Sequence, residues 1–227
     1  MDWKNREKYD LTFTVLSDLH MTHRGQGLQK LNMYRCGASE MNPKPERQRF
    51  AGDLVYQIDC SGGGVCPELY PEPYDYLNMA LSRYTKDIPT FYVMGNHEFP
   101  QNRHEPELMA QARELFKEKT GKPLMFHETV NGYHFIGFSC MAWDIVPIPE
   151  VEKYVTREVK KALKESTLPV FVLYHRPIRH TVEDSEEPSY SEAFGKFLLS
   201  DKRIINICGH LHTPSDSPVC LYQKKGG

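Results

Sequence analysis

Short apolar stretches that stop abruptly at a glycine or a polar side chain recur along the chain. Stretches of this kind, rich in β-branched and aromatic residues, are typical of buried strands. The pattern predicts strands at residues 11–16, 90–94, 170–174 and 204–208. The sharpest ending is at Gly95, after which three polar side chains follow at once, so this strand is expected to stop at a tight turn.

Apolar residues at helical spacing separate these strands. They predict helices near residues 28–34, 73–86, 106–120, 151–162 and 194–198. Asn131-Gly132 lies between two apolar stretches and predicts a β-hairpin. Strands that alternate with helices and are interrupted by one hairpin indicate an α/β fold with helices outside the sheets. At 227 residues the chain is expected to form a single domain, residues 1–227.

One segment fits this layout poorly. Residues 43–50 contain prolines and several charges, yet they lead into Gly52-Asp53, before which a buried strand is expected. Only Phe50 and Ala51 at its end are apolar, so the sequence predicts a poorly formed strand before Asp53.

The composition argues against a partner bound by charge. Lys and Arg total 28 against 30 Asp and Glu, a formal net charge of -2, and no basic run is present. Binding to a nucleic-acid polymer or to an anionic membrane surface is therefore not expected. No apolar stretch approaches the roughly 20 residues of a membrane-spanning helix. Residues 1–6 are charged and do not resemble a signal peptide, so the cytoplasm is the expected location.

The six cysteines lack the paired spacing of a zinc ribbon. Cys60 and Cys66 bracket a glycine-rich stretch, which leaves open a small disulfide loop between them. Reduced thiols are the expectation for a cytoplasmic chain.

Side chains that can bind metals follow nearly every predicted strand. Open α/β sheets collect their functional groups at the carboxyl ends of strands. The candidates there are Asp18, His20, Asp53, Asn96, His97, His175, His210 and His212. In an extended segment residues two apart point to the same side, so each Asp-x-His or His-x-His pair can face one ion. So large a set exceeds the about four ligands of one zinc-like ion and favours two ions that share a carboxylate.

Taken singly, the motifs at residues 18–20, 52–53, 95–98 and 209–212 are weak or moderately specific. Their order and their positions after strands make a chance origin of the full set very improbable. Over about residues 11–213 the chain resembles the calcineurin-like metallophosphoesterases, whose pattern is Asp-x-His, Gly-Asp, Gly-Asn-His-(Asp/Glu), a later His and Gly-His-x-His. The resemblance implies a four-layer α/β/β/α sandwich with a dinuclear metal site.

The resemblance also implies a role for each candidate. The ligands implied for the first metal are Asp18, His20 and His212. Those implied for the second metal are Asn96, His175 and His210. Asp53 would bridge the two metals, and His97 would face the substrate phosphate and the leaving group without binding a metal.

The chemistry expected of such a site is hydrolysis of a phosphoester. Two cations about 3.5–4 Å apart clamp the phosphate oxygens and activate a bridging water for in-line attack on phosphorus. Beside them, Asn96 would also contact the substrate, and His97 can stabilise charge and protonate the leaving group because its intrinsic pKa is close to neutral. Mixed nitrogen and oxygen ligands accept manganese, iron or zinc, so the identity of the metals stays open.

The leading hypothesis is a metal-dependent hydrolase of a small phosphodiester. Serine/threonine protein phosphatases carry an arginine soon after the Gly-Asp motif, whereas residues 54–57 contain none. The alternatives are a phosphomonoesterase of broad specificity and a non-catalytic binding module that kept the fold. A nuclease ranks lower because there is no basic track.

The C-terminal end departs from the family pattern. Members usually continue past Gly-His-x-His with further strands, whereas only residues 213–227 follow here. The second sheet is therefore expected to be short and to leave an exposed edge.

Overall fold

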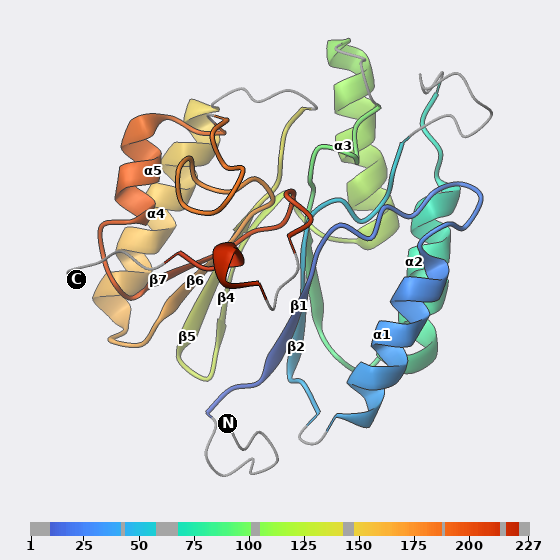
Figure 1. The fold of residues 1–227 in the computed structure, drawn as a ribbon, viewed down its shortest axis with the longest axis horizontal. Helices are drawn as coiled ribbons and strands as arrows, with labels where there is room; N and C mark the ends of the chain where they lie inside the picture. Colours follow the sequence, from blue (N-terminus) through green and yellow to red (C-terminus); the bar gives the residue numbers. More distant parts are fainter. Residues whose placement is uncertain are drawn as a thin grey trace.

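The computed structural model describes residues 10–41, 44–57, 68–100, 105–142, 148–187, 189–213 and 217–222. Two sheets lie between helices in this part of the chain, with α1–α3 beside one sheet and α4 and α5 beside the other (Figure 1). The strands are β1 Phe13–Leu16, β2 Arg47–Ala51, β3 Thr90–Val93, β4 Met125–Val130, β5 Tyr133–Phe138, β6 Val170–Leu173 and β7 Ile204–Ile207. The helices are α1 Leu28–Glu40, α2 Glu72–Tyr84, α3 Pro106–Thr120, α4 Pro149–Glu165 and α5 Glu192–Leu198, followed by a 3₁₀ turn at Pro218–Cys220.

The first sheet has the order β1-β2-β3, and all three strands run parallel. Phe50 of β2 lies opposite Leu16 of β1 and Tyr92 of β3, so the three strands end at the same edge of the sheet. The prediction of a poorly formed strand before Asp53 is therefore wrong, because β2 is the central strand of this sheet.

A charged strand is stable at this position because its charge is paired. Arg49 is fully buried, and its guanidinium donates to Glu128 of β4 in the other sheet. The same guanidinium lies over the ring of Phe135, 4.4 Å from its centroid. A buried cation is tolerated when it is ion-paired and packed on an aromatic face. The sequence alone does not disclose a partner that lies 79 residues away.

The second sheet has the order β4-β5-β6-β7. The predicted hairpin is present between β4 and β5, and its turn residues Asn131 and Gly132 have φ of 52° and 82°. Both values lie in the left-handed region that a two-residue hairpin turn requires. The pairs β5-β6 and β6-β7 are parallel, so β6 and β7 also end at a common edge.

The two sheets share a core. Ala51 and Val93 from the first sheet pack in one cluster with Phe126, Phe135 and Leu173 from the second. Separate clusters lie between the first sheet and helices α1–α3 and between the second sheet and helices α4 and α5.

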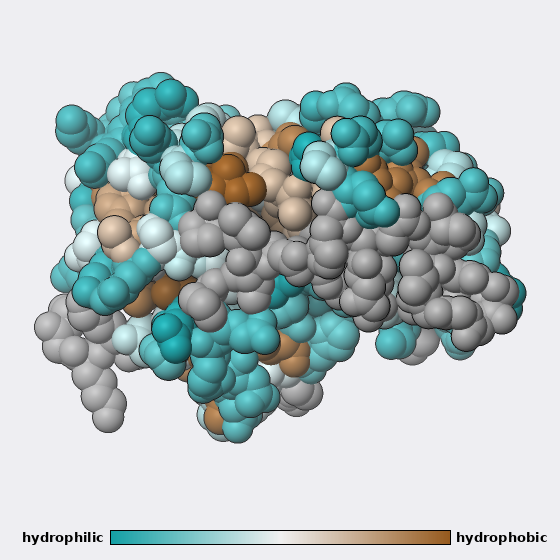
Figure 2. Space-filling view, turned by 90° about the horizontal axis from the view of Figure 1, so that it is seen from above, coloured by the Kyte–Doolittle hydropathy of each residue, from teal (hydrophilic) through white to brown (hydrophobic). Residues whose placement is uncertain are grey.

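The outer strands of the two sheets are partly open. Val15 of β1 and Ile205 of β7 are 38% and 40% exposed. Among the described residues β7 pairs on one side only, as expected for a short second sheet. Figure 2 shows the face seen from above, where hydrophilic residues predominate and apolar patches lie between them. Within the described residues, no helix has both the length and the apolar character needed to cross a membrane.

Candidate metal centre

The loops that follow β1, β2, β6 and β7 are joined by hydrogen bonds at the carboxyl ends of their strands. The amide of Asp18 donates to the carbonyl of Gly52 at 3.1 Å, and the amide of Gly209 donates to the carbonyl of His175 at 2.9 Å. Across the two sheets, the amide of His210 donates to Oδ2 of Asp18 at 3.1 Å. Side chains from both sheets are thereby held at one place.

The backbone of these loops is strained. Asp18, His20, Asp53, His210 and His212 have φ between 49° and 78°, in the left-handed region that residues with a β-carbon rarely adopt. These residues therefore do not lie in extended segments, and the prediction that extended backbone makes the residues of each pair share a face is wrong. Asp18 and His20 nevertheless lie close together, with Nε2 of His20 3.9 Å from Oδ1 of Asp18. His210 and His212 fall into two different groups of close ligand atoms, so the prediction that they face one ion together is wrong. Such strain costs about 1–3 kcal/mol per residue and is typical of functional sites.

One cluster consists of Asp18, His20 and His212, whose ligand atoms all lie within 4.8 Å of one another. Nε2 of His212 is 3.3 Å from Oδ1 of Asp18 and 2.9 Å from Nε2 of His20. These are the three residues predicted to hold the first metal, and the structure brings all three together.

A second cluster consists of Asp53, His175 and His210, again with ligand atoms within 4.8 Å of one another. Oδ2 of Asp53 lies 3.0 Å from Nε2 of His175. Nδ1 of His175 is 2.8 Å from the carbonyl oxygen of Ala51, a contact that orients Nε2 toward Asp53. Asn96, also predicted for the second metal, is buried at the end of β3.

Several buried polar atoms of the centre lack a hydrogen bond. They are Oδ1 of Asn96 and Nδ1 of His20, while Oδ2 of Asp53 and Nε2 of His175 face each other at 3.0 Å without good hydrogen-bond geometry. Buried oxygen and nitrogen atoms normally have a partner, and a metal ion would supply one here. The donor set of carboxylate, amide and imidazole groups suits a manganese, iron or zinc ion. The residues present therefore fit a metal centre.

His97 lies beside these clusters. Its amide donates to Oδ1 of Asp53 at 2.9 Å, and its ring nitrogen Nε2 is 3.9 Å from Oδ2 of the same carboxylate. The ring packs against Tyr56 at 4.3 Å and His20 at 4.8 Å between centroids. Asp53, His20 and His97 also form a group with ligand atoms within 4.8 Å, so Asp53 belongs to two of the three groups found in the described residues.

Burial and neighbouring charges leave one charged pair in the site and make other imidazoles neutral. Burial lowers the pKa of His97 to about 4 and that of His210 to about 3. Burial also opposes protonation of His175, but the adjacent Asp53 carboxylate raises its pKa to about 9. Burial tends to raise the pKa of Asp53, yet His175 outweighs it and holds that pKa well below its usual range. At neutral pH Asp53 and His175 form a buried ion pair, and His97 and His210 are neutral.

Glu98 organises the backbone around Asp53, and sequence reasoning gave it no role. Its buried carboxylate accepts the amide hydrogens of Asp53, Leu54, Val55 and Gly95. Burial raises its pKa to about 8, and the nearby negative charge of Asp53 adds to this. Its position as the last residue of the Gly-Asn-His-Glu motif was the signal that could have identified it.

The glycines of the motifs are required by close packing against the site. A β-carbon on Gly95 would overlap Oδ1 of Asp53, and one on Gly209 would overlap the side chains of Ser17 and Asp18. Glycine at these two motif positions therefore allows neighbouring loops of the site to approach each other closely.

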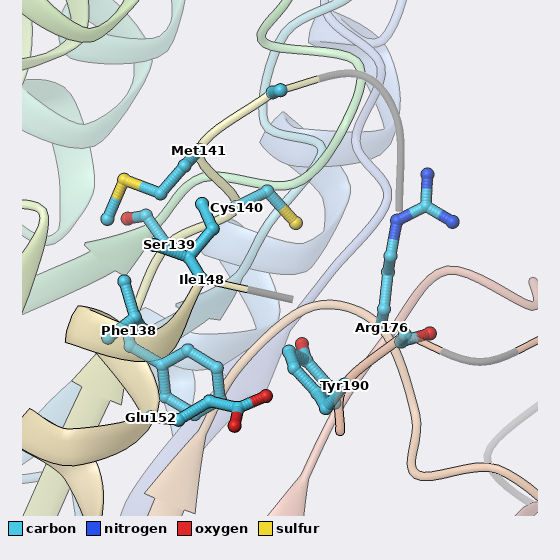
Figure 3. Close-up of a pocket in the computed structure, with 11 residues that line it drawn as sticks. Phe138, Ser139, Cys140, Met141, Ile148, Glu152, Arg176 and Tyr190 are labelled. Carbon is cyan, nitrogen blue, oxygen red and sulfur yellow. The ribbon is translucent and has the colours of Figure 1, made fainter. Parts of the chain in front are cut away.

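Arg176 also reaches the centre, although sequence reasoning did not select it. It directly follows His175, and its Nη1 is 3.3 Å from Nε2 of His210. Figure 3 shows Arg176 on one side of a small pocket, with Cys140 and Met141 on another side and Tyr190 near its base. The pocket has a volume of about 40 Å³, and most of the residues that line it are apolar.

The remaining histidines of the described chain lie apart from these clusters. His23 stacks on Tyr70 at 4.4 Å between ring centroids. His127 and His134 contact each other through ring nitrogens 2.8 Å apart, and Glu158 of α4 contacts His127. His180 lines a cleft beside α5. Cys60 and Cys66 lie outside the described residues.

Comparison with known proteins identifies the family. A family model for calcineurin-like phosphoesterases matches residues 11–214. No curated protein sequence matches the chain.

Solved structures with a similar fold include a dimetal phosphatase from Danio rerio, at 12% identity and a TM-score of 0.48, which covers 84% of this chain and 76% of that one. The protein TT1561 of Thermus thermophilus matches at 14% identity and a TM-score of 0.45, over 84% of this chain and 76% of that one. The phosphopantetheinyl hydrolase of Mycobacterium tuberculosis matches at 15% identity and a TM-score of 0.42, over 89% of this chain and 83% of that one.

Proposed function

The chain belongs to the calcineurin-like phosphoesterase family and is a hydrolase of that family, and from this premise we propose that it hydrolyses a small phosphodiester with the help of two metal ions. The observation that carries the proposal is the position of Asp53 between the two clusters. Its Oδ2 lies 3.0 Å from Nε2 of His175 and 3.9 Å from Nε2 of His20. A carboxylate so placed can bridge two ions.

The proposed ligands divide into two sets around this carboxylate. For the first metal they are Asp18, His20 and His212. For the second they are Asn96, His175 and His210. The lowered pKa values of His20 and His210 suit these roles, because only a neutral imidazole offers a lone pair to a metal. His175, whose pKa Asp53 raises, would release its proton on binding a metal. Manganese, iron and zinc all suit such donors.

When bound, the metals would supply an activated water and positive charge for the phosphate oxygens. The residues of the chain would hold and orient the reactants. Asn96 offers an amide oxygen that adds no charge to the site. His97, whose pKa burial lowers to about 4, would hydrogen bond to the substrate phosphate, whose negative charge would raise the pKa of the ring and prepare it to protonate the leaving oxygen.

Two features support a small diester as the substrate. Within the described segment 54–57 no arginine follows Asp53 to grip a phosphorylated protein side chain. The pocket beside Arg176 has a volume of about 40 Å³, whereas one water needs about 10–15 Å³. A short apolar ester group would fill it. A phosphomonoesterase is the second candidate, because Arg176 beside the centre could neutralise the extra charge of a monoester.

Hydrolysis of bis(p-nitrophenyl) phosphate and of p-nitrophenyl phosphate by protein loaded with each metal tests this function. The diester should be cleaved at least as well as the monoester, and the metal content should approach two per chain. The reverse ranking would favour the monoesterase. Absence of bound metal after loading would favour a non-catalytic binding module. His23→Ala is a suitable control, since His23 stacks on Tyr70 outside the clusters.

We also infer that the two sheets are the inner layers of a four-layer α/β/β/α sandwich. The core that Ala51 and Val93 share with residues of the second sheet supports this arrangement.

A further inference from the structure

Tyr56 lies beside the centre and has no assigned role. It is half-buried and comes three residues after Asp53, in the loop that follows β2. Its ring forms a T-shaped contact with the imidazole of His97, with the centroids 4.3 Å apart and an angle of 66° between the planes. The ring of His20 is also near, with its centroid 5.4 Å from that of Tyr56. A tyrosine therefore packs on the imidazole proposed to protonate the leaving group.

The backbone of His97 is fixed by hydrogen bonds on both sides. Its amide donates to Oδ1 of Asp53 at 2.9 Å, and its carbonyl accepts from the amide of Gln57 at 3.0 Å. With the backbone held in this way, the position of the imidazole depends on the two side-chain torsions of His97. Neighbouring rings that pack on an aromatic side chain restrict such torsions.

The backbone that carries the Tyr56 ring is anchored as well. The amide of Tyr56 donates to the carbonyl of Met21 at 2.7 Å, next to a β-bridge between Met21 and Val55. The buried side chain of Gln57 exchanges two hydrogen bonds with the backbone of Tyr70, at 2.9 Å and 2.8 Å. The ring of Tyr56 therefore extends from an anchored segment and can serve as a fixed packing surface.

The orientation of a proton donor matters for its efficiency. A leaving oxygen is protonated well only by a group within hydrogen-bond reach, about 2.6–3.2 Å. Even a partial loss of the right orientation lowers the rate, although the proton donor itself is still present.

We propose, on the basis of the function proposed above, that Tyr56 is a positioning residue for His97. Its ring holds the imidazole in the orientation from which His97 gives its proton to the leaving oxygen as the P–O bond breaks. The role belongs to the aromatic ring and not to the hydroxyl group, so phenylalanine should replace tyrosine with little loss.

The test is a double-mutant cycle. It measures kcat, KM and metal content for manganese-loaded wild type, Tyr56→Leu, His97→Ala and the double variant, with bis(p-nitrophenyl) phosphate as the substrate. Tyr56→Leu should lower kcat by about two- to tenfold, as expected for the loss of one aromatic contact, with KM and metal content unchanged. In the His97→Ala background the same change should have no further effect, because the group that Tyr56 positions is then absent.

Matched variants separate the ring from other effects. Tyr56→Phe keeps the ring and should restore most of the lost rate, and Tyr56→Met should reproduce the loss if leucine impairs folding. Tyr70→Leu removes a tyrosine ring that stacks on another histidine, His23, outside the clusters, and it should leave kcat unchanged. The loss in Tyr56→Leu should be larger with diphenyl phosphate, whose leaving group depends more strongly on protonation.

A kcat of Tyr56→Leu equal to that of wild type would overturn the assignment, and so would a fall in kcat that loss of metal fully explains. An equal loss in the presence and in the absence of His97 would also overturn it, because Tyr56 would then act on another step.

Failure of wild type to hydrolyse any phosphoester would refute the proposed function, and crystal structures of Tyr56→Leu and Tyr56→Phe would then decide the positioning role alone. A His97 imidazole that is turned in Tyr56→Leu and in place in Tyr56→Phe supports that role. An imidazole that is unmoved in both variants refutes it.

Discussion

Two ion pairs join the two sheets, and they differ in whether their facing atoms form hydrogen bonds of good geometry. At the carboxyl edge Asp53 of the first sheet meets His175 of the second, and Oδ2 and Nε2 lack a hydrogen bond of good geometry although they lie 3.0 Å apart. Between the sheets Arg49 meets Glu128, which accepts from Arg49 and also from Arg47 at 3.1 Å.

The backbone conformation and the packing around the two pairs also differ. The loops around Asp53 contain strained left-handed residues, whereas Arg49 lies in a regular strand and packs on the ring of Phe135. Buried polar atoms that stay unsatisfied on strained backbone indicate a place where a ligand completes the structure. An ion pair that forms a hydrogen bond between two regular strands, as Arg49 and Glu128 do, indicates a role in holding the sheets together. The comparison predicts loss of function at one pair and loss of stability at the other.

The largest effect is expected for Asp53→Asn. An amide in place of the carboxylate proposed to be shared would remove a negative charge between the two proposed cations, so hydrolysis should fall to background and the metal content should drop below that of wild type. Elemental analysis and rates on bis(p-nitrophenyl) phosphate measure both. An Asp53→Asn protein with full metal content and near-normal rates would remove the bridging role.

His97→Ala should lower kcat by about 10²–10⁴-fold, the usual contribution of a general acid. The metal content should stay at the wild-type level, because His97 is proposed to contact the substrate and not the metals. Metal loss in this variant would instead assign His97 to the ligand shell, as its membership of a cluster with His20 and Asp53 would allow.

Glu128→Gln should destabilise the fold by about 2–3 kcal/mol, below the 3–5 kcal/mol typical of a fully buried pair because the Glu128 side chain is 20% exposed. Urea unfolding measures this loss, and kcat at a temperature where the variant is folded should equal that of wild type. The matched control is Glu114→Gln, which removes an exposed pair with Lys117 and should change stability by less than about 1 kcal/mol. If Glu128→Gln had the same free energy of unfolding as wild type, the pair of Arg49 and Glu128 would not have the stabilising role inferred from the comparison.

The smallest effect is expected for the pair formed by Glu158 of α4 and His127 of β4. A hydrogen bond from His127 lowers the pKa of Glu158 in the folded protein. Ionised Glu158 therefore stabilises the fold at pH values above the ordinary pKa of glutamate. This stabilisation is lost as the pH falls through the lowered pKa of Glu158 in the folded protein. Thermal unfolding between pH 6 and pH 3 should show a shallower decline for Glu158→Gln than for wild type. Parallel profiles would show that Glu158 does not contribute.

Much of the site could be predicted because its signals are local. An apolar stretch that ends at Gly95 places Asn96 and His97 at a strand end, and four such motifs in order identified the family that the comparison confirms. Helix α1 begins at Leu28 as predicted but continues to Glu40. This extension was not predicted, because residues 35–40 lack the apolar stripe that indicates a helix.

The features that sequence reasoning missed depend on distant partners. Strand β2 carries Arg49, whose charge excludes it from a buried strand until Glu128, 79 residues away, is taken into account. Likewise Arg176 acquires significance only from its contact with His210, 34 residues away. The left-handed backbone at Asp18 and His20 has only a weak local sequence signal, since aspartate and histidine adopt positive φ more often than most residues with a β-carbon but less readily than glycine.

The most direct measurement is anomalous diffraction from crystals of the manganese-loaded protein. Two peaks are predicted about 3.5–4 Å apart, with the Asp53 carboxylate between them, His20 beside one peak and His175 beside the other. A single peak, or peaks that do not contact Asp53, would contradict the account of a dinuclear centre assembled from the strand ends of both sheets.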